Sequence, residues 1–358
     1  MPAAPFILLA LLAAPPSARP SSGDVLGDWC REAAADPLNP WALAHGLAFE
    51  RRAFRARDGR LAADVIVSDF LQRDPLHFAV TTPDGTPVEP HPHLMAKSLL
   101  LAGFPLSHVF RTPSGPVPLR AILATVSRDF RPEVALSPQG AWMLDALAHA
   151  LPASGAFTPA EGPAVRLGPL MDEALALLER EQVDLLAGMK AGLPQVPKRK
   201  QGLYAHPCGG LHLVQAVLTH ARHPTVRAAW GARLDTQVDL LFYRLGSEAR
   251  QYDAALAATP PAERLPVLVQ RVKFYGHWLE TLGRYRDETG WKPTPAQLQS
   301  LQHAGALLDG AVRRLDASGV WRTREALKAA RSPLFLDLTG DTCHAARGWH
   351  DWRHHLGG

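Results

Sequence analysis

Helical periodicity is the feature that most constrains the fold of this chain. In the segment LPVLVQRVKFYGHWLETLGRY, apolar residues recur at steps of three and four, at Leu268, Val272, Tyr275, Leu279 and Leu282. This spacing places their side chains on one face of an α-helix. Segments GARLDTQVDLLFYRL and GAWMLDALAHAL repeat the pattern. We therefore expect an all-α protein.

Strand signals are sparse by comparison. Asp84-Gly85 lies between two short β-leaning runs in HFAVTTPDGTPVEP, a pattern typical of a hairpin turn, and the related segment RTPSGPVPL begins at Arg111. Breaks rich in Pro and Gly separate the helical segments. The sequence thus predicts helical hairpins with one or two small β-hairpin insertions.

The composition is that of a globular protein. The chain has 358 residues, of which 47% are hydrophobic and 20% charged, so it can bury one large core or two modest ones. Lys and Arg (38) only slightly exceed Asp and Glu (34), and the densest basic cluster is the short PKRKQ at 197–201. Scattered charge of this kind does not favour a nucleic-acid partner.

The N-terminus has the pattern of an export signal. An apolar run from Phe6 to Ala14 is followed by Pro15-Pro16 and the small residues Ser17-Ala18. The run fits the apolar region of a signal peptide and is far shorter than the roughly 20 residues that span a bilayer as a helix. We expect residues 1–18 to be a signal peptide and 19–358 to form a single α-helical domain, periplasmic or secreted, with no stable membrane span.

A similar helix opening recurs along the chain. His91-Pro92-His93 and His206-Pro207-Cys208 each precede a helical run, and Pro suits the first turn of a helix because its missing N–H would have no partner there. The pattern places His93 and Cys208 in a first turn. NPWALAHGLAFE, with His45, and TGDTCHAARGWHDW, with Cys343-His344 after a capping Asp341 or Thr342, are further openings of this kind.

The spacing of these openings predicts the architecture. The intervals from His45 through His93, Cys208 and His277 to His344 suit helical hairpins of about 50 to 70 residues, some of them doubled. Hairpins arranged in a ring bring the ends of their inner helices to one central cavity. We expect an α/α toroid, with a helical-repeat or orthogonal-bundle domain as the alternative.

The cysteines indicate a shared centre. Cys208 from one helix, with Cys343 and His344 from another, supplies three zinc-type ligands and leaves a fourth position for water, and His212 lies one turn after Cys208 as a candidate acid or base. In an oxidising compartment, a Cys208–Cys343 disulfide is the alternative. That alternative describes a non-catalytic binding or scaffold protein.

These residues resemble the lanthionine synthetase C-like cyclases. Members of that family are helical toroids whose zinc is held by a Cys near a Gly and by a later Cys-His pair, and they carry an Ala-His-Gly element that here is similar to Ala44-His45-Gly46. The resemblance implies that Cys208, Cys343 and His344 hold zinc and that His45 is an acid or base. It rests on short motifs, and the reaction of the family is not transferred to this chain.

A polar stripe on the helix that carries Leu268 gives a second candidate site. Lys273, His277, Glu280 and Arg284 recur at helical spacing opposite the apolar face, and His277 with Glu280 forms a plausible acid/base pair. A solvated, salt-bridged face is the alternative interpretation.

Aromatic residues near this stripe support a third class of function. Trp278, Tyr275 and Tyr285 would suit a sugar-stacking cleft of a carbohydrate-active toroid, or they belong to the core. The sequence has no Gly-rich phosphate loop, no Gly-x-Ser-x-Gly and no His-Glu-x-x-His. The partner is therefore left open among a small molecule, a peptide and a saccharide.

Overall fold

The computed structural model describes residues 20–330 and 332–357. Within these residues the chain forms fifteen α-helices and three two-stranded antiparallel sheets, which confirms the expected all-α class with small β-hairpin insertions. The predicted signal peptide, 1–18, lies outside the described residues. None of the described helices is long and apolar enough to cross a membrane.

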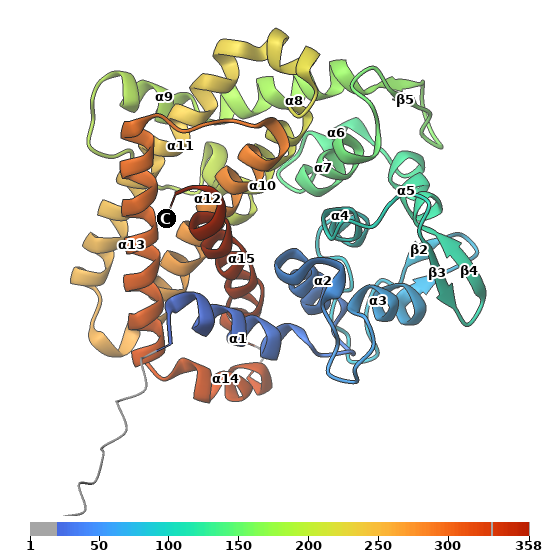
Figure 1. Ribbon diagram of the computed structural model, residues 1–358, viewed down its shortest axis with the longest axis horizontal. Helices are drawn as coiled ribbons and strands as arrows, with labels where there is room; N and C mark the ends of the chain where they lie inside the picture. Colours follow the sequence, from blue (N-terminus) through green and yellow to red (C-terminus); the bar gives the residue numbers. More distant parts are fainter. Residues whose placement is uncertain (1–19, 331, 358) are drawn as a thin grey trace, which may run out of the picture.

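Six inner helices form a closed ring (Figure 1). In chain order they are α2 (Pro40–Glu50), α4 (Leu94–Leu101), α7 (Ala141–Ala150), α10 (Leu211–His220), α12 (Leu265–Thr289) and α15 (Pro333–His355). Each of them contacts the next, and α15 contacts α2. This is the arrangement of an α/α toroid.

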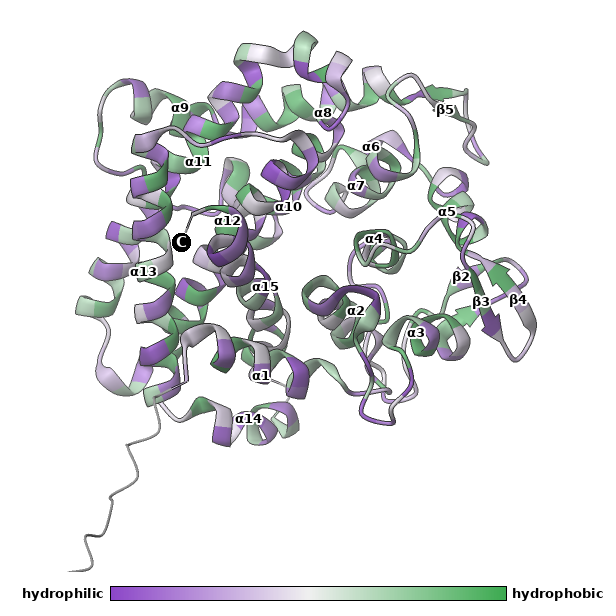
Figure 2. Ribbon diagram, in the orientation of Figure 1, coloured by the Kyte–Doolittle hydropathy of each residue, from purple (hydrophilic) through white to green (hydrophobic). Residues whose placement is uncertain are grey.

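A second set of helices surrounds the ring. It comprises α1 (Ser22–Ala34), α3 (Ala62–Phe70), α5 (Leu119–Arg128), α8 (Leu167–Glu181), α11 (Pro224–Ala258) and α13 (Pro295–Ala317). Figure 2 shows α13 alternating between hydrophilic and hydrophobic turns, as expected for a helix with one face in solvent. By contrast, every residue of the inner helix α10 is buried.

Short elements fill the connections. They are α6 (Pro132–Ala135), α9 (Val183–Lys190), α14 (Val320–Ala329), the 3-10 turns η1 (Arg51–Ala53), η2 (Gly202–Ala205), η3 (Pro207–Gly210) and η4 (Pro261–Glu263), and the strand pairs β1 (Leu71–Gln72) with β2 (His77–Phe78), β3 (Val109–Thr112) with β4 (Gly115–Pro118), and β5 (Ala156–Phe157) with β6 (Val165–Arg166). The predicted turn at Asp84-Gly85 is closed by a single bridge between Thr81 and Pro87.

The core lies between the two layers of helices. The five apolar residues whose spacing predicted α12, from Leu268 to Leu282, are all buried. Helix starts follow local chemistry: Thr294 and Gln297 form a capping box at α13, and α15 begins at Pro333 after the capping Ser332.

A disulfide joins the outer and inner layers. Cys30 of α1 is bonded to Cys343 of α15, with Cα atoms 4.8 Å apart. The predicted Cys208–Cys343 disulfide is therefore wrong, because Cys343 already has a partner and Cys208 is a free thiol.

Two predicted helix openings also differ from the structure. Cys343 and His344 lie in the middle of α15 rather than at its start, since the run that begins at Pro333 continues through them. His93 precedes α4 in a left-handed conformation. The sequence Gly340-Asp341-Thr342 before Cys343 has the composition of a helix cap, which explains the wrong prediction.

Candidate metal centre

A cavity of about 200 Å³ lies at the centre of the ring. All six inner helices contribute to its wall, α7 through Trp142. Leu336, which is 42% exposed, also lines it and connects it to the surface. The inner helices thus converge on one cavity as predicted, but α12 and α15 contribute His277 and His344 from their middle turns and not from their ends.

Cys208 enters this cavity from an unusual turn. Cys208, Gly209 and Gly210 have φ values of 52°, 60° and 75°, so three successive residues adopt the left-handed region. For a residue with a Cβ this costs roughly 1–2 kcal/mol. A Cβ on Gly210 would lie 2.1 Å from Leu203 Cδ1, so glycine is required there. The expected helical first turn at Cys208 is replaced by η3, and regular helix begins at Leu211.

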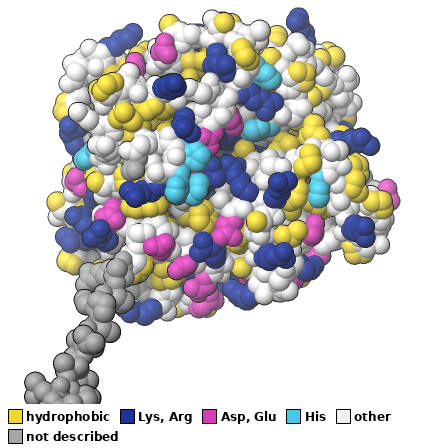
Figure 3. All heavy atoms as spheres, in the orientation of Figure 1, with side chains coloured by type: hydrophobic (Ala, Val, Ile, Leu, Met, Phe, Trp, Pro, Cys, Tyr) yellow, Lys and Arg dark blue, Asp and Glu magenta, His cyan; other side chains and the backbone are white. Residues whose placement is uncertain are grey.

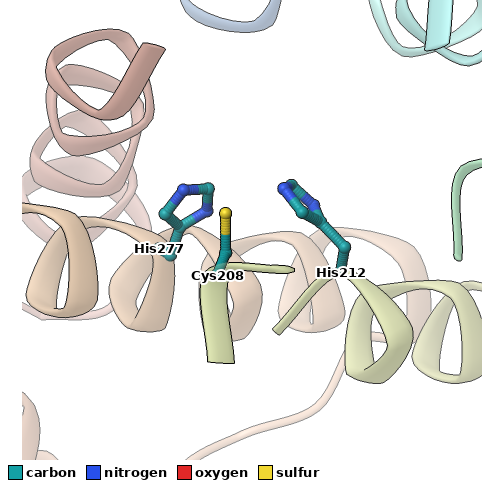
Figure 4. A group of neighbouring side chains, drawn as sticks. All are labelled: Cys208, His212 and His277. Carbon is teal, nitrogen blue, oxygen red and sulfur yellow. The ribbon is translucent and has the colours of Figure 1, made fainter. Parts of the chain in front are cut away.

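Three ligand atoms converge at the wall of the cavity. Cys208, His212 and His277 each offer one donor, and these donors all lie within 4.8 Å of one another. Figure 4 shows the Cys208 sulfur pointing into the space between the two imidazole rings. Thiolate sulfur with imidazole nitrogen is a donor set that suits zinc-type ions. This group of residues is able to hold a metal ion.

Two polar side chains, Gln215 and Lys97, contact Nδ1 of His212. The Thr281 hydroxyl donates to the His277 carbonyl oxygen and accepts from Gln215 Nε2, so Gln215 Oε1 faces His212 Nδ1 at 3.1 Å. Gln215 thus favours a hydrogen on Nδ1, whereas Lys97 Nζ, which lies 3.4 Å from the same nitrogen, can only donate and favours a lone pair there. Burial, with Lys97 nearby, lowers the pKa of His212 well below its ordinary value. A neutral ring of this kind is ready to bind a metal.

His277 lies between sulfur and carboxylates. Its ring nitrogens are 3.4 Å from Asp341 Oδ1 and 3.5 Å from Glu280 Oε2, but neither makes an aligned hydrogen bond within the described residues. Burial opposes a charge on the ring, yet the Cys208 sulfur and the Asp341 carboxylate raise the pKa of His277 well above its usual range. Two buried nitrogens without aligned partners fit a group that binds here.

His344 and Glu280 form a dyad beside this group. His344 Nδ1 donates to Glu280 Oε2 at 2.7 Å. Although burial disfavours an ionised carboxylate, His344 and His277 hold the pKa of Glu280 well below its ordinary value. Burial lowers the pKa of His344, so its ring is neutral with Nε2 unprotonated. With His277, these two residues also form a second candidate metal-binding group.

His45 completes the cluster of imidazoles. Its Nδ1 donates to the Trp41 carbonyl at 2.7 Å, and its ring centre lies 5.2 Å from that of His344. Burial and the neighbouring His344 lower the pKa of His45 to about 3. His45 thus lines the cavity as a neutral base, although it belongs to neither of the two metal-binding groups.

The polar stripe on α12 points inward. Lys273, His277 and Glu280 line the cavity, which differs from a solvated face. Arg284 is paired with the buried Asp145, which also binds Lys97 at 3.2 Å. The stripe faces inward because α12 is an inner helix, and its ion pairs satisfy the charges that burial would otherwise penalise.

Other predicted residues lie elsewhere. Trp278 and Tyr275 are fully buried and Tyr285 is 6% exposed, so the three belong to the core and form no sugar-stacking cleft. Cys343 is wrong as a metal ligand because its sulfur is in the disulfide. Sequence reasoning missed Lys97 and Trp142, whose approach to the site depends on how α4 and α7 pack.

A separate histidine group lies at the end of α15. His350, Asp351 and His355 are close enough to hold an ion, and His350 is exposed. In the face shown in Figure 3, His side chains gather with Lys and Arg near the place where α15 ends in Figure 1. Basic residues in the last turn of a helix complement its dipole.

Comparison with family models, curated proteins and solved structures finds no match for this chain. The chemistry of the cavity therefore carries the argument about function.

Proposed function

We propose that this protein is a metal-dependent enzyme whose Cys208, His212 and His277 hold one zinc-type ion in the central cavity. The observation that carries the proposal is the convergence of these three donors within 4.8 Å at the cavity wall. A zinc-type ion with three protein ligands lowers the pKa of bound water and polarises carbonyl groups.

Three features of the residues fit such an ion. His212 is held by Gln215 at 3.1 Å, and burial lowers the pKa of its ring, which keeps it neutral. The buried nitrogens of His277 have no aligned partner within the described residues. The turn Cys208–Gly210 adopts a strained left-handed backbone conformation, and this conformation directs the Cys208 sulfur into the cavity. Ligands oriented by hydrogen bonds of this kind are typical of metal sites.

The Glu280–His344 dyad supplies an acid or base beside the centre. His344 keeps its proton at Nδ1, where Glu280 accepts it, so Nε2 is free to take a proton from a molecule in the cavity. The Glu280 carboxylate then stabilises the resulting imidazolium. The role expected for His344 therefore changes from ligand to base, with His45 as a second neutral imidazole nearby.

The proposal keeps only part of what the resemblance to lanthionine synthetase C-like proteins implies. The toroid, the zinc-type ion and Cys208 are retained. Cys343 is replaced as a ligand by a histidine of α12, because Cys343 is bonded to Cys30. The reaction of that family is not transferred to this chain.

We place the protein in the periplasm or outside the cell. The Phe6–Ala14 run and the Cys30–Cys343 disulfide support this, since stable disulfides form in oxidising compartments. Sequencing the N-terminus of the protein from its native source tests the proposal, and an intact Met1 on cytoplasmic protein would contradict it.

A thiol nucleophile is a second candidate function. A left-handed Cys208 beside His277, which is 3.4 Å from Asp341, has the order of groups found in Cys-His-Asp catalysis. In that case the thiol attacks a carbonyl carbon, His277 takes the thiol proton, and the proton passes to the leaving group.

Metal content tests the main proposal. The full chain is loaded with Co²⁺ and dialysed, and the bound ion is measured by elemental analysis and by its visible spectrum. We expect about one tightly bound ion per chain with sulfur-to-cobalt charge transfer, and loss of that band in Cys208→Ala. The control His350→Gln/His355→Gln changes only the surface group and should keep the band. Equal spectra for wild type and Cys208→Ala would overturn the proposal.

Alkylation separates the two candidate functions. Cys208 is the free cysteine, so iodoacetamide labels it selectively. Protection by stoichiometric Zn²⁺ supports the metal centre. Rapid labelling that Zn²⁺ does not slow, and that Asp341→Asn does slow, supports the nucleophile instead.

A further inference from the structure

The cavity has two chemically different halves. The donors of the two candidate metal-binding groups in the cavity come from α10, α12, α15 and the turn before α10. The opposite half, from α2, α4 and α7, is mostly apolar and aromatic, although His45, Lys97 and Ser98 also line it. Its apolar residues are Trp41, Ala44, Ala48, Leu94, Leu101 and Trp142. A molecule in this cavity therefore meets polar donors on one side and an apolar wall on the other.

The apolar wall directly adjoins the donors. The Trp142 ring lies 4.6 Å from the His212 ring, and the Trp41 ring lies 4.2 Å from the His45 ring, centre to centre. Trp142 is also stacked on His91 at 3.7 Å, which fixes its plane. An apolar group attached to a metal-binding group would thus contact indole surface without leaving the centre.

The charges that line the cavity are already paired. Lys97 binds Asp145 at 3.2 Å, and Lys273 lies 3.3 Å from both Asp337 and Asp341. Glu280 is held by His344. Among the described lining residues no lysine is therefore left to receive an anionic group. An anionic group on the part of the ligand away from the three donors would be desolvated without a lysine partner, which is costly.

The size of the cavity limits the ligand further. A buried cavity of about 150 Å³ accommodates benzene, so the 200 Å³ here accepts about one aromatic ring with a small polar group. We infer that the substrate is a small molecule that joins an uncharged apolar group of about that size to a polar group facing Cys208, His212 and His277. This inference rests on the proposed function and names its substrate class.

Two hydroxamates test the inference, because they share a metal-binding group and differ in the group attached to it. Acetohydroxamate carries a methyl group and benzohydroxamate a phenyl ring. Each is titrated into the cobalt-loaded full chain, and the change in the visible spectrum gives its affinity. We expect benzohydroxamate to bind about tenfold or more tightly, because the ring buries apolar surface against the wall.

Two variants locate the preference in the wall. Trp41→Ala should reduce the preference for benzohydroxamate to about threefold or less, whereas the matched control Trp291→Ala, on a half-buried indole outside the cavity, should keep it. Ala48→Phe, about two helical turns after Trp41 on α2, fills part of the cavity and should abolish the preference while acetohydroxamate still binds. Ala48 is half-buried and lines the cavity, so the added ring occupies free volume.

The outcomes distinguish this inference from the proposed function. Without a Cys208-dependent cobalt band, the metal centre itself fails. A normal band with equal affinities for the two hydroxamates overturns the inference alone. A preference that persists in both Trp41→Ala and Ala48→Phe overturns it as well, since the ring then binds elsewhere.

Discussion

Cys343 is bonded to Cys30, and the residue that follows it, His344, turns its ring into the central cavity. Both sulfurs are fully buried. The bond ties the outer helix α1 to the inner helix α15 one residue from the dyad with Glu280. The covalent link and the candidate site thus share a segment of chain.

Removal of the disulfide should destabilise the whole protein. We expect Cys30→Ala/Cys343→Ala to lower the free energy of unfolding by about 2–5 kcal/mol, since the bond closes a very long loop. Urea denaturation measures the change. Cys208→Ala is the control and should cost less, because Cys208 is a half-buried free thiol. Equal losses in the two variants would show that the bond contributes little.

The turn at Cys208 should depend on Gly210. Gly210→Ala forces a Cβ to 2.1 Å from Leu203 Cδ1 and strains a left-handed residue, so we expect a loss of more than about 2 kcal/mol. Gly192 is also left-handed, at φ 65°, but its Cβ would meet nothing within 4 Å. Gly192→Ala should therefore cost only about 1 kcal/mol. Thermal or urea unfolding compares the two, and similar costs would contradict the steric argument.

Arg244 should stabilise the turn Cys208–Gly210. It is fully buried, pairs with Glu248 at 2.8 Å and donates to the Gly209 carbonyl at 3.0 Å. Arg244→Met leaves Glu248 buried with a weaker partner set, and we expect a loss of about 3–5 kcal/mol.

The control for Arg244 is a pair nearer the surface. Arg233 binds Glu179 at 2.7 Å with about a third of both side chains exposed. Arg233→Met should cost at most about 1 kcal/mol. If urea unfolding gave equal losses for the two arginine variants, burial would not be the cause.

Glu288 should make stability depend on pH. Burial opposes its ionisation, but Arg284 and His149 lower its pKa to about 2. Because the folded pKa is depressed, its contribution is present above the unfolded value of about 4.3 and is lost as the pH falls toward 2. Glu288→Gln should cost on the order of 2 kcal/mol at pH 6 and much less near pH 2. Unfolding measured at both pH values tests this, with exposed Glu161→Gln as the variant that should leave the pH dependence unchanged.

Helical periodicity is local, so the sequence could predict the helices from which the ring is built. The spacing from Leu268 to Leu282 reports which face of α12 is buried, and the structure buries that face. The same pattern did not show that the opposite face is enclosed too. From the sequence alone, Lys273 and Glu280 have the spacing of solvent-facing residues. Buried and exposed ion pairs recur at the same spacing along a helix, so only the packing of the ring shows that these two are enclosed.

The cysteine pairing was beyond sequence reasoning for a related reason. Cys30 belongs to an outer helix and Cys343 to an inner one, and their proximity depends on how α1 packs on α15. The Cys208 turn was misread because Pro207 opens a regular helix as readily as a 3-10 turn, and only the φ values of Gly209 and Gly210 distinguish the two. His277 was predicted as an acid or base, and its place beside Cys208 follows from the contact of α10 with α12.

Because α15 closes the ring against α2, the cavity draws His45 from near one end of the chain and His344 from near the other. No fragment that emerges early in synthesis can assemble it. The proposed ion needs only residues of η3, α10 and α12, but a ligand that also contacts His45 and His344 recognises only the finished protein, and its binding stabilises α2 and α15 together. Occupancy of the cavity by such a ligand would thus report that the whole chain has folded.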